Sequence, residues 1–361
     1  MANFDNVPSS PEPSAMTRRS TMRDVAASAG VSLMTVSRVV NGEPAVHPET
    51  AARVERAIRR LGYQRNDTAR QLRRRGQPTQ TIGVLVDDLA NPFFASLARA
   101  VEDAARLRDY VVLIGSSNDS LRRERDVLSA FCARQVDGLI VVPVAGDHRF
   151  LSHQLSLGTK VVCADRPSDS LRVDTVLVDN RAAARAAVRH LLDQGHRRIG
   201  YLGDRSDIWS VRERYAGYCA ARDDQGLAGD PSVVRHGLRS RTMAAQAAAS
   251  LMALSEPPSA LFASNNVTTL GAIDAMRGQA SGIALVGFDD FALADKLSPP
   301  VTVVAQDPVA IGATAAQLLF ARIAGDSSAP REVLLRTHLI ERGSGEIAAP
   351  PATRNRAILS E

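Results

Sequence analysis

The chain has 361 residues, of which 45% are apolar and only 4% aromatic, and it carries a net charge of +5, a composition typical of a globular protein with more than one domain. The sequence has no run of about 18 apolar residues, which excludes a membrane-spanning helix. The polar start MANFDNVPSSPEPSAM has no apolar signal-peptide core, so we expect a cytoplasmic protein.

The positive charge is concentrated near the N-terminus. Residues 17–76 contain 13 arginines against five acidic residues, a local balance of +8, so the rest of the chain is net negative. Positive charge gathered in one module favours a polyanion as its partner.

The first helix is predicted close to the N-terminus. Residues 1–20 show no hydrophobic periodicity and predict a disordered arm. In TMRD, the side chains of Thr21 and Asp24 can satisfy free N–H groups at a helix start. Gly30 suits the turn that ends this helix, because glycine adopts the left-handed backbone of a helix C-terminus without strain.

Two further helices follow. Ser32 can cap the second, which carries valines at helical spacing. Pro48 suits the first turn of the third, and Gly62 ends it. Together the three helices predict an all-α helix-turn-helix headpiece over residues 21–65.

Residues 66–80, NDTARQLRRRGQPTQ, combine a capping asparagine with a run of arginines. Asn66 can start a short helix, which Gly76 and Pro78 would end. We expect a hinge helix followed by a linker.

From Thr81 the pattern changes to short apolar strands that alternate with amphipathic helices. The predicted strands are TIGVLV, YVVLIG, VDGLIVV, KVVCA, TVLV, RRIGYLG, SALFA and IALVGF. Strands that are apolar throughout and separated by helices indicate parallel sheets covered on both faces. The segment contains more strand–helix units than one compact sheet normally holds. We therefore predict an α/β core of two similar parallel-sheet lobes over residues 81–342. Residues 343–361 are predicted to be a flexible tail.

A set of short segments spans nearly the whole chain in a fixed order. They are TMRDVAASAGVSLMTVSRVVN, NDTARQL, IGVLVDDLANPFF, VDGLIVVP, DN followed by HLLDQGHRRIGYLGD, RERYAGY, VGFDD and SPPVTVVAQD. In this order they resemble the LacI/GalR family of bacterial transcription repressors. The resemblance implies a homodimer that binds double-stranded operator DNA, and a core similar to periplasmic sugar-binding proteins with a small effector between its lobes. It implies no enzyme activity, cofactor or metal.

The resemblance assigns DNA contacts to the second helix, which would lie in the major groove. Arg38 matches a base-contacting arginine, and its fork suits guanine O6 and N7, whereas Leu33 and Met34 could touch a thymine methyl. Alternatively, Leu33 and Met34 are core residues and Arg38 is a solvated charge. The implied headpiece contacts are Thr21, Ser32, Leu33, Met34, Thr35, Ser37 and Arg38.

The resemblance also assigns DNA contacts to Asn66, Ala69 and Leu72 in the hinge. Leu72 matches the family's leucine that wedges into the minor groove and bends the duplex. The alternative is an ordinary amphipathic linker helix. A helix this short is not stable alone, so dimer and DNA must order it together.

The same comparison implies an effector site whose members suit a sugar. Carboxylates and amides bond hydroxyl groups, an arginine donates two hydrogen bonds, and phenyl rings stack on C–H faces. One of the two phenylalanines is alternatively core, and Asp289 or Asp290 could instead cap a helix. The implied residues are Asp87, Phe93, Phe94, Arg214, Asn265 and Asp289.

Two positions depart from the family's commonest pattern. Asn266 stands where many members carry aspartate, and Arg239 falls where several place an aromatic that covers the ligand. If Arg239 and Arg214 both face the cleft, the effector could be an anion such as a sugar acid. Otherwise Arg239 is a surface residue.

Two other functions fit an alternating α/β chain: a sugar-metabolising enzyme and a cytosolic sugar-binding protein. No G-x-G-x-x-G follows a predicted strand, and the P-loop, H-E-x-x-H and G-x-S-x-G motifs do not occur. A basic headpiece has no use in a free sugar-binding protein. The sequence therefore predicts a repressor of carbohydrate transport or catabolism genes, controlled by a sugar or sugar acid, with His196 in a structural role.

Overall fold

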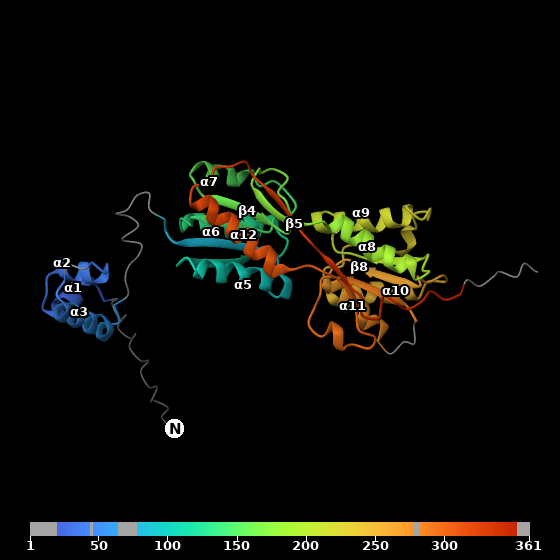
Figure 1. The fold of residues 1–361 in the computed structure, drawn as a ribbon, viewed down its shortest axis with the longest axis horizontal. Helices are drawn as coiled ribbons and strands as arrows, with labels where there is room; N and C mark the ends of the chain where they lie inside the picture. Colours follow the sequence, from blue (N-terminus) through green and yellow to red (C-terminus); the bar gives the residue numbers. More distant parts are fainter. Residues whose placement is uncertain (1–19, 44–45, 64–77, 278–281, 352–361) are drawn as a thin grey trace, which may run out of the picture. The chain divides into compact units, whose positions relative to one another are not determined.

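The computed structural model describes residues 20–43, 46–63, 78–277 and 282–351. The chain forms two compact units, Met1–Gln77 and Pro78–Glu361 (Figure 1). The predicted arm lies outside the described residues except for Ser20, and so does the predicted hinge except for residues 78–80.

The described part of the first unit has three helices, whose ends follow the predicted caps. Thr21 and Asp24 form a reciprocal capping box, and Gly30 adopts a left-handed backbone with φ of 63°. Ser32 caps the second helix by accepting a hydrogen bond from the Thr35 N–H at 3.1 Å. The helices are α1 (Met22–Ala29), α2 (Leu33–Val40) and α3 (Pro48–Leu61).

One residue from each helix lies at the centre of this unit's core. Val25, Val36 and Val54 are completely buried, and smaller alanines fill the space around them. Because α2 buries only Val36 fully, most of its surface is left for other contacts.

The described residues of the second unit form two six-stranded sheets, as the alternating pattern predicted. The first sheet has the order β11-β5-β4-β3-β1-β2, and all its pairs are parallel. Its strands are β1 (Thr81–Val86), β2 (Val111–Ser116), β3 (Gly138–Val141), β4 (Lys160–Ala164), β5 (Asp174–Val178) and β11 (Glu332–Leu335).

The second sheet has the order β12-β10-β9-β8-β6-β7, and only its β10–β12 pair is antiparallel. Its strands are β6 (Ile199–Leu202), β7 (Val234–Arg235), β8 (Ala260–Ala263), β9 (Ala284–Phe288), β10 (Thr302–Ala305) and β12 (His338–Ile340). The eight predicted strands are all present, and β7, β10, β11 and β12 are additional to them.

Helices cover both faces of each sheet, so the central strands are mostly buried and largely apolar. In the first lobe, α5 and α12 pack together on one face and α6 lies on the other. In the second lobe, α8 and α9 lie on the opposite face from α10 and α11 (Figure 1). The helices are α5 (Pro92–Arg106), α6 (Leu121–Ala133), α7 (Ser152–Ser156), α8 (Asn180–Asp193), α9 (Trp209–Asp223), α10 (Arg241–Met252), α11 (Asn266–Met276) and α12 (Pro308–Ile323).

Within residues 78–277 and 282–351, the chain passes between the lobes three times. It leaves the first lobe after β5, returns between β10 and α12, and leaves again between β11 and β12. The carboxyl ends of parallel strands in α/β sheets carry most ligand sites. Polar residues that follow β4, β5, β9 and β10 are therefore placed close to the segments that join the lobes.

The prediction of a flexible tail from residue 343 is wrong for residues 343–351, which pack on the second lobe. Ser344 is buried, and its hydroxyl donates to the Leu285 carbonyl at 2.6 Å and accepts from the Thr302 N–H at 2.9 Å. His196 contacts the Ile347 carbonyl at 2.8 Å, in agreement with its predicted structural role. These contacts are hydrogen bonds between single side chains and backbone groups. They require no repeating pattern of apolar residues, so the sequence gives no sign that the segment is ordered. Residues 352–361 lie outside the described part of the chain.

We predict that a chain ending at Arg342 is less stable than the full-length protein. Removal of Ser344 leaves the buried Thr302 N–H and Leu285 carbonyl without hydrogen-bond partners. Each buried group left unpaired costs about 1–3 kcal/mol. Thermal unfolding should give a lower melting temperature for the chain that ends at Arg342. A chain ending at Pro351 should have the melting temperature of the full-length protein. Equal stability of both truncations would contradict a structural role for residues 343–351.

Candidate functional site

Helix α2 presents an apolar and basic face to solvent. Leu33 and Met34 are 46% and 65% exposed, although both side chains are large and apolar. Arg38 lies one turn further along, 3.8 Å from the carboxylate of Glu43. The alternative interpretation of Leu33 and Met34 as core residues is therefore wrong, and both are available for contact with a partner.

Hydroxyl groups cluster at the start of α2 and at its end. The hydroxyls of Ser32 and Thr35 lie 2.9 Å apart, and Ser37 accepts from the Asn41 amide at 3.4 Å. Thr21 instead donates to its capping partner Asp24 at 2.7 Å. Contact of these groups with DNA stays a prediction, and the predicted hinge contacts Asn66, Ala69 and Leu72 lie outside the described residues.

Helix α3 adds positive charge to the same unit. Its exposed arginines are Arg53, Arg56, Arg59 and Arg60. Glu55 lies 3.8 Å from Arg59, and an exposed pair of this kind contributes little to stability. The unit therefore keeps a basic surface, the electrostatic footprint of a protein that binds nucleic acid.

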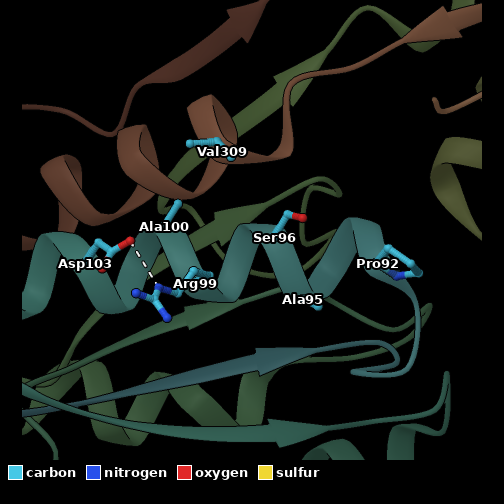
Figure 2. Close-up of a pocket in the computed structure, with 7 residues that line it drawn as sticks. All are labelled: Pro92, Ala95, Ser96, Arg99, Ala100, Asp103 and Val309. Atoms are coloured by element: carbon cyan, nitrogen blue, oxygen red, sulfur yellow. Dashed lines mark hydrogen bonds and ion pairs between the residues drawn. The ribbon is translucent and has the colours of Figure 1, made fainter. Parts of the chain in front are cut away.

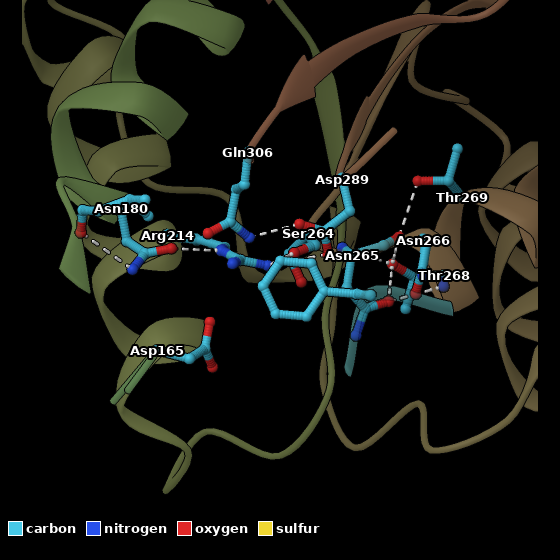
Figure 3. Close-up of polar contacts among 12 residues, drawn as sticks. Asp165, Asn180, Arg214, Ser264, Asn265, Asn266, Thr268, Thr269, Asp289 and Gln306 are labelled. Carbon is cyan, nitrogen blue, oxygen red and sulfur yellow. Dashed lines mark hydrogen bonds and ion pairs between the residues drawn. The ribbon is translucent and has the colours of Figure 1, made fainter. Parts of the chain in front are cut away.

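In the second unit, Arg214 forms the centre of a buried polar cluster (Figure 3). Arg214 lies on helix α9, and its guanidinium donates to Asn180 Oδ1 at 2.7 Å and to the Ser264 carbonyl at 2.6 Å. The carboxylate of Asp289 lies 3.7 Å away, and the ring of Phe288 lies under the guanidinium at 3.7 Å. These partners come from the ends of β8 and β9 and from the start of α8, directly after the first segment that joins the lobes.

Asp289 follows β9 with a left-handed backbone, φ of 69°, a conformation that aspartate adopts more readily than most residues other than glycine. Gln306, on the second segment between the lobes, donates its amide N–H to Asp289 Oδ1 at 2.5 Å. The amide oxygen of Gln306 is buried without a hydrogen-bond partner. A buried acceptor left unpaired is the kind of group that a ligand hydroxyl can satisfy.

Two asparagines join the lobes. Asn91 caps α5 of the first lobe, and its side-chain oxygen accepts from the Asn266 amide of α11 at 2.8 Å. The predicted effector residue Asn265 instead caps α11, because its side-chain oxygen accepts from the Thr268 N–H at 2.8 Å. The position that departs from the family's aspartate, Asn266, is thus a lobe-to-lobe contact.

On the first lobe, Asp87 belongs to a second buried cluster, which surrounds Arg166. The guanidinium donates to Asp87 and Asp119, both at 3.1 Å, and lies 3.4 Å from Asp165. Burial disfavours the charged guanidinium, but the three aspartates raise the pKa of Arg166 above its usual value. Burial is also the main cause that raises the pKa of Asp87 and of Asp165.

The two phenylalanines of the predicted site differ. Phe94 is 6% exposed and belongs to the core of the first lobe, as the alternative interpretation of one of the pair predicted. Phe93 is only partly buried, and its ring meets that of Phe94 edge to face at 5.1 Å. Phe93 is therefore the ring of the pair that retains exposed surface.

Sequence reasoning missed several polar residues of these clusters. Asp165, Arg166, Asn180 and Gln306 share one signal, a position just after a buried strand or at a segment that joins the lobes, where ligands of α/β sheets bind. Asn91 and Asp119 lie in the loops after β1 and β2 and carry no such signal. The missed residues are Asn91, Asp119, Asp165, Arg166, Asn180 and Gln306.

Two family models match the chain. Residues 21–66 match bacterial regulatory proteins of the lacI family, and residues 188–345 match a periplasmic binding protein-like domain. The repressor CytR of Escherichia coli is 32% identical over 332 residues, which are 90% of this chain and 96% of that protein. The chain belongs to the LacI family of bacterial regulatory proteins.

Other LacI-family proteins extend this similarity. The regulator CelR of Thermobifida fusca is 33% identical over 342 residues, 91% of this chain and 99% of that protein. A lac repressor dimer bound to operator and the anti-inducer ONPF has a TM-score of 0.77 at 26% identity, and covers 92% of this chain and 100% of that one. A CelR–cellobiose complex has a TM-score of 0.67 at 30% identity, and covers 90% of this chain and 100% of that one.

These similarities confirm the predicted family and fold class, and they show that this LacI-family chain is a transcriptional regulator. The relatives are named as regulators rather than as enzymes. Among the helices of the described ranges, none is long and apolar enough to cross a membrane.

We predict that Asp165→Asn raises the melting temperature of the effector-free protein near neutral pH. Burial raises the pKa of Asp165, so its ionised form is disfavoured in the folded protein. Asp165 therefore does not destabilise the folded protein below the pKa of an aspartate in the unfolded chain, about 4. As the pH rises through the higher pKa that Asp165 has in the folded protein, the free energy of unfolding decreases. Melting curves between pH 3 and pH 7 should show the two proteins converging in acid and the variant more stable near neutrality. A variant less stable than wild type at pH 7 would contradict this.

Proposed function

We propose that this LacI-family regulator is a homodimeric repressor of genes for carbohydrate transport or catabolism. Its affinity for a double-stranded operator is set by a small sugar-like effector held between the two lobes. The observation that carries the proposal is a basic helical unit with an exposed reading face, joined to a core in which buried polar groups from both lobes converge. Because operator DNA lies in the cytoplasm of a bacterium, the protein acts there.

The exposed face of α2 supports base recognition. The Arg38 guanidinium can bond guanine O6 and N7, and Leu33 and Met34 can contact a thymine methyl. The weak 3.8 Å contact with Glu43 is exposed and easily exchanged for a base edge. The hydroxyls near the start of α2 can donate hydrogen bonds to phosphates, and such contacts fix the register of the protein on DNA without reading its sequence.

The clusters between the lobes support a polyhydroxylated effector. Aspartate, asparagine and glutamine side chains bond hydroxyl groups, and the unpaired Gln306 oxygen accepts from one. Phe93 offers exposed ring surface for the C–H face of a sugar. The similar CelR structure is a complex with cellobiose, which agrees with this choice.

An exposed apolar surface on the first lobe supports a homodimer. A groove of about 390 Å³ runs along α5 beside α12, lined by Pro92, Ala95, Ser96, Arg99, Ala100, Asp103 and Val309 (Figure 2). Strand β2, which packs against α5, is an edge strand, and Val111 and Ile114 on it are 61% and 40% exposed. Exposed apolar edges of this kind mark association surfaces. The similar lac repressor structure is a dimer on operator.

The alternatives are a sugar-binding protein without DNA affinity and an enzyme that turns over a sugar. A gel-shift assay with genomic fragments, run beside an assay for sugar turnover, separates the three functions. Sequence-specific retardation without turnover supports the repressor. Turnover without retardation would overturn it.

We predict that Arg38→Ala loses preference for the operator more than general affinity for DNA. The expected loss of discrimination is about 1–3 kcal/mol at one guanine per half-site, because a base contact disappears and phosphate contacts remain. Fluorescence anisotropy at fixed salt with operator and random duplexes measures both affinities. The control Arg56→Ala, on the exposed face of α3, should affect both duplexes alike. Equal weakening of both duplexes by Arg38→Ala would make Arg38 a phosphate contact.

We predict that Arg214→Lys uncouples the operator from the effector. Lysine keeps a positive charge beside Asp289 but loses the fork that bonds Asn180 and Ser264 together. Calorimetry with whichever sugar stabilises the wild type in a thermal-shift screen should show at least a tenfold loss of affinity, about 1.4 kcal/mol. Operator affinity should then stop responding to that sugar at concentrations that act on the wild type. Arg212→Lys, exposed on the same helix, is the control, and an intact response in Arg214→Lys would contradict the scheme.

A further inference from the structure

The Arg166 cluster carries more negative than positive charge. One guanidinium is shared among three aspartates, and Asp119 and Asp165 are 8% and 4% exposed. One terminal nitrogen of the guanidinium donates to Asp119, the other donates to Asp87, and Nε lies 3.4 Å from Asp165. Each nitrogen of Arg166 therefore faces an aspartate carboxylate, which a further anion would have to displace.

The other arginines between the lobes are occupied as well. Arg205 of the second lobe reaches Asp119 of the first, with 3.3 Å to its carboxylate and 3.2 Å to its carbonyl, and also pairs with Asp207. Arg214 is paired with Asp289 and donates to neighbouring oxygens.

Arg239 is exposed and donates to the Asn118 carbonyl of the first lobe at 3.4 Å. Arg239 therefore reaches the boundary between the lobes, where an arginine could attract an anionic effector. Its attraction for an anion is screened by water and weakened further by the nearby carboxyl of Asp204, with which it interacts electrostatically.

We propose that Asp87 and Asp119 set the charge specificity of the effector site, so that it takes uncharged polyhydroxylated effectors and rejects sugar acids and sugar phosphates. An anionic ligand could reach Arg166 only by displacing one of these aspartates, which would leave a desolvated carboxylate without its partner. It would also meet Asp165 and Asp204, which are like charges. Specificity gained by repulsion of this kind needs no additional contact to the accepted ligand. The inference rests on the proposed effector site and chooses between the two effector classes that the sequence allowed.

The raised pKa values of three carboxyls at this boundary agree with the proposal. Burial is the first cause for Asp87, Asp165 and Asp204 alike, and each is also affected by neighbouring aspartates. A site that already disfavours its own negative charges disfavours another one.

The experiment is calorimetry on the full-length protein with matched neutral and anionic probes. The pairs are glucose with glucuronate, galactose with galacturonate, and ribose with ribose 5-phosphate, together with inorganic phosphate. Wild type is expected to show no saturable binding of any anionic probe. The variants Asp87→Asn and Asp119→Asn, which keep the shape of the side chain and remove its charge, should each gain on the order of tenfold or more in affinity for at least one anion.

Asp88→Asn is the matched control, because Asp88 is adjacent and exposed, and its removal changes the net charge by the same amount. It should bind anions no better than wild type. If Asp119→Asn fails to fold, as judged by circular dichroism, Asp87→Asn and the wild-type titrations still decide the question.

Saturable binding of an anionic probe to wild type at one site per chain would overturn the proposal. So would the absence of any gain in the folded Asp87 and Asp119 variants. Failure of every neutral sugar to bind or to change operator affinity would instead count against the sugar-like effector of the proposed function, since the anion titrations do not depend on a neutral ligand.

Discussion

The buried guanidinium of Arg214 is the charge around which the second lobe and the joining segments are arranged. Removing a charge from water costs several kcal/mol unless partners replace the lost hydration. Asn180, Ser264 and Asp289 supply those partners from the start of α8 and from two strand ends. Their backbone positions are therefore tied to one another, and the left-handed backbone of Asp289 is part of that arrangement.

A similar constraint acts in the first lobe, where Arg166 is surrounded by aspartates of its own lobe. Each lobe thus neutralises its buried arginine internally, and contacts across the boundary run through groups such as Asn91 with Asn266 and Arg205 with Asp119. Lobes that are internally satisfied and joined by polar contacts can move as rigid bodies. A ligand that binds both lobes then changes their relative position only through its differential affinity for the two arrangements.

Sequence patterns predicted the elements whose causes are local. The Thr21 cap, the Gly30 turn and the eight apolar strands are all present. Each of these features depends on residues that are close together in the sequence. The ordered residues 343–351 were missed, since Ser344 bonds backbone groups about 40 and 60 residues away. Strands β11 and β12 were missed because they are short, half-exposed edge strands without a strong apolar run.

For the site, the sequence by itself determined which residue types are present and, through family resemblance, that Arg214 and Asp289 belong together. Tertiary structure alone decided that Arg166 meets Asp119, 47 residues away, and that Asn91 meets Asn266, 175 residues away. Such pairs follow from the order of strands in each sheet and from the three crossings between lobes. The charge of a side chain is fixed by its sequence, whereas the neighbours that neutralise that charge are fixed by the topology of the fold.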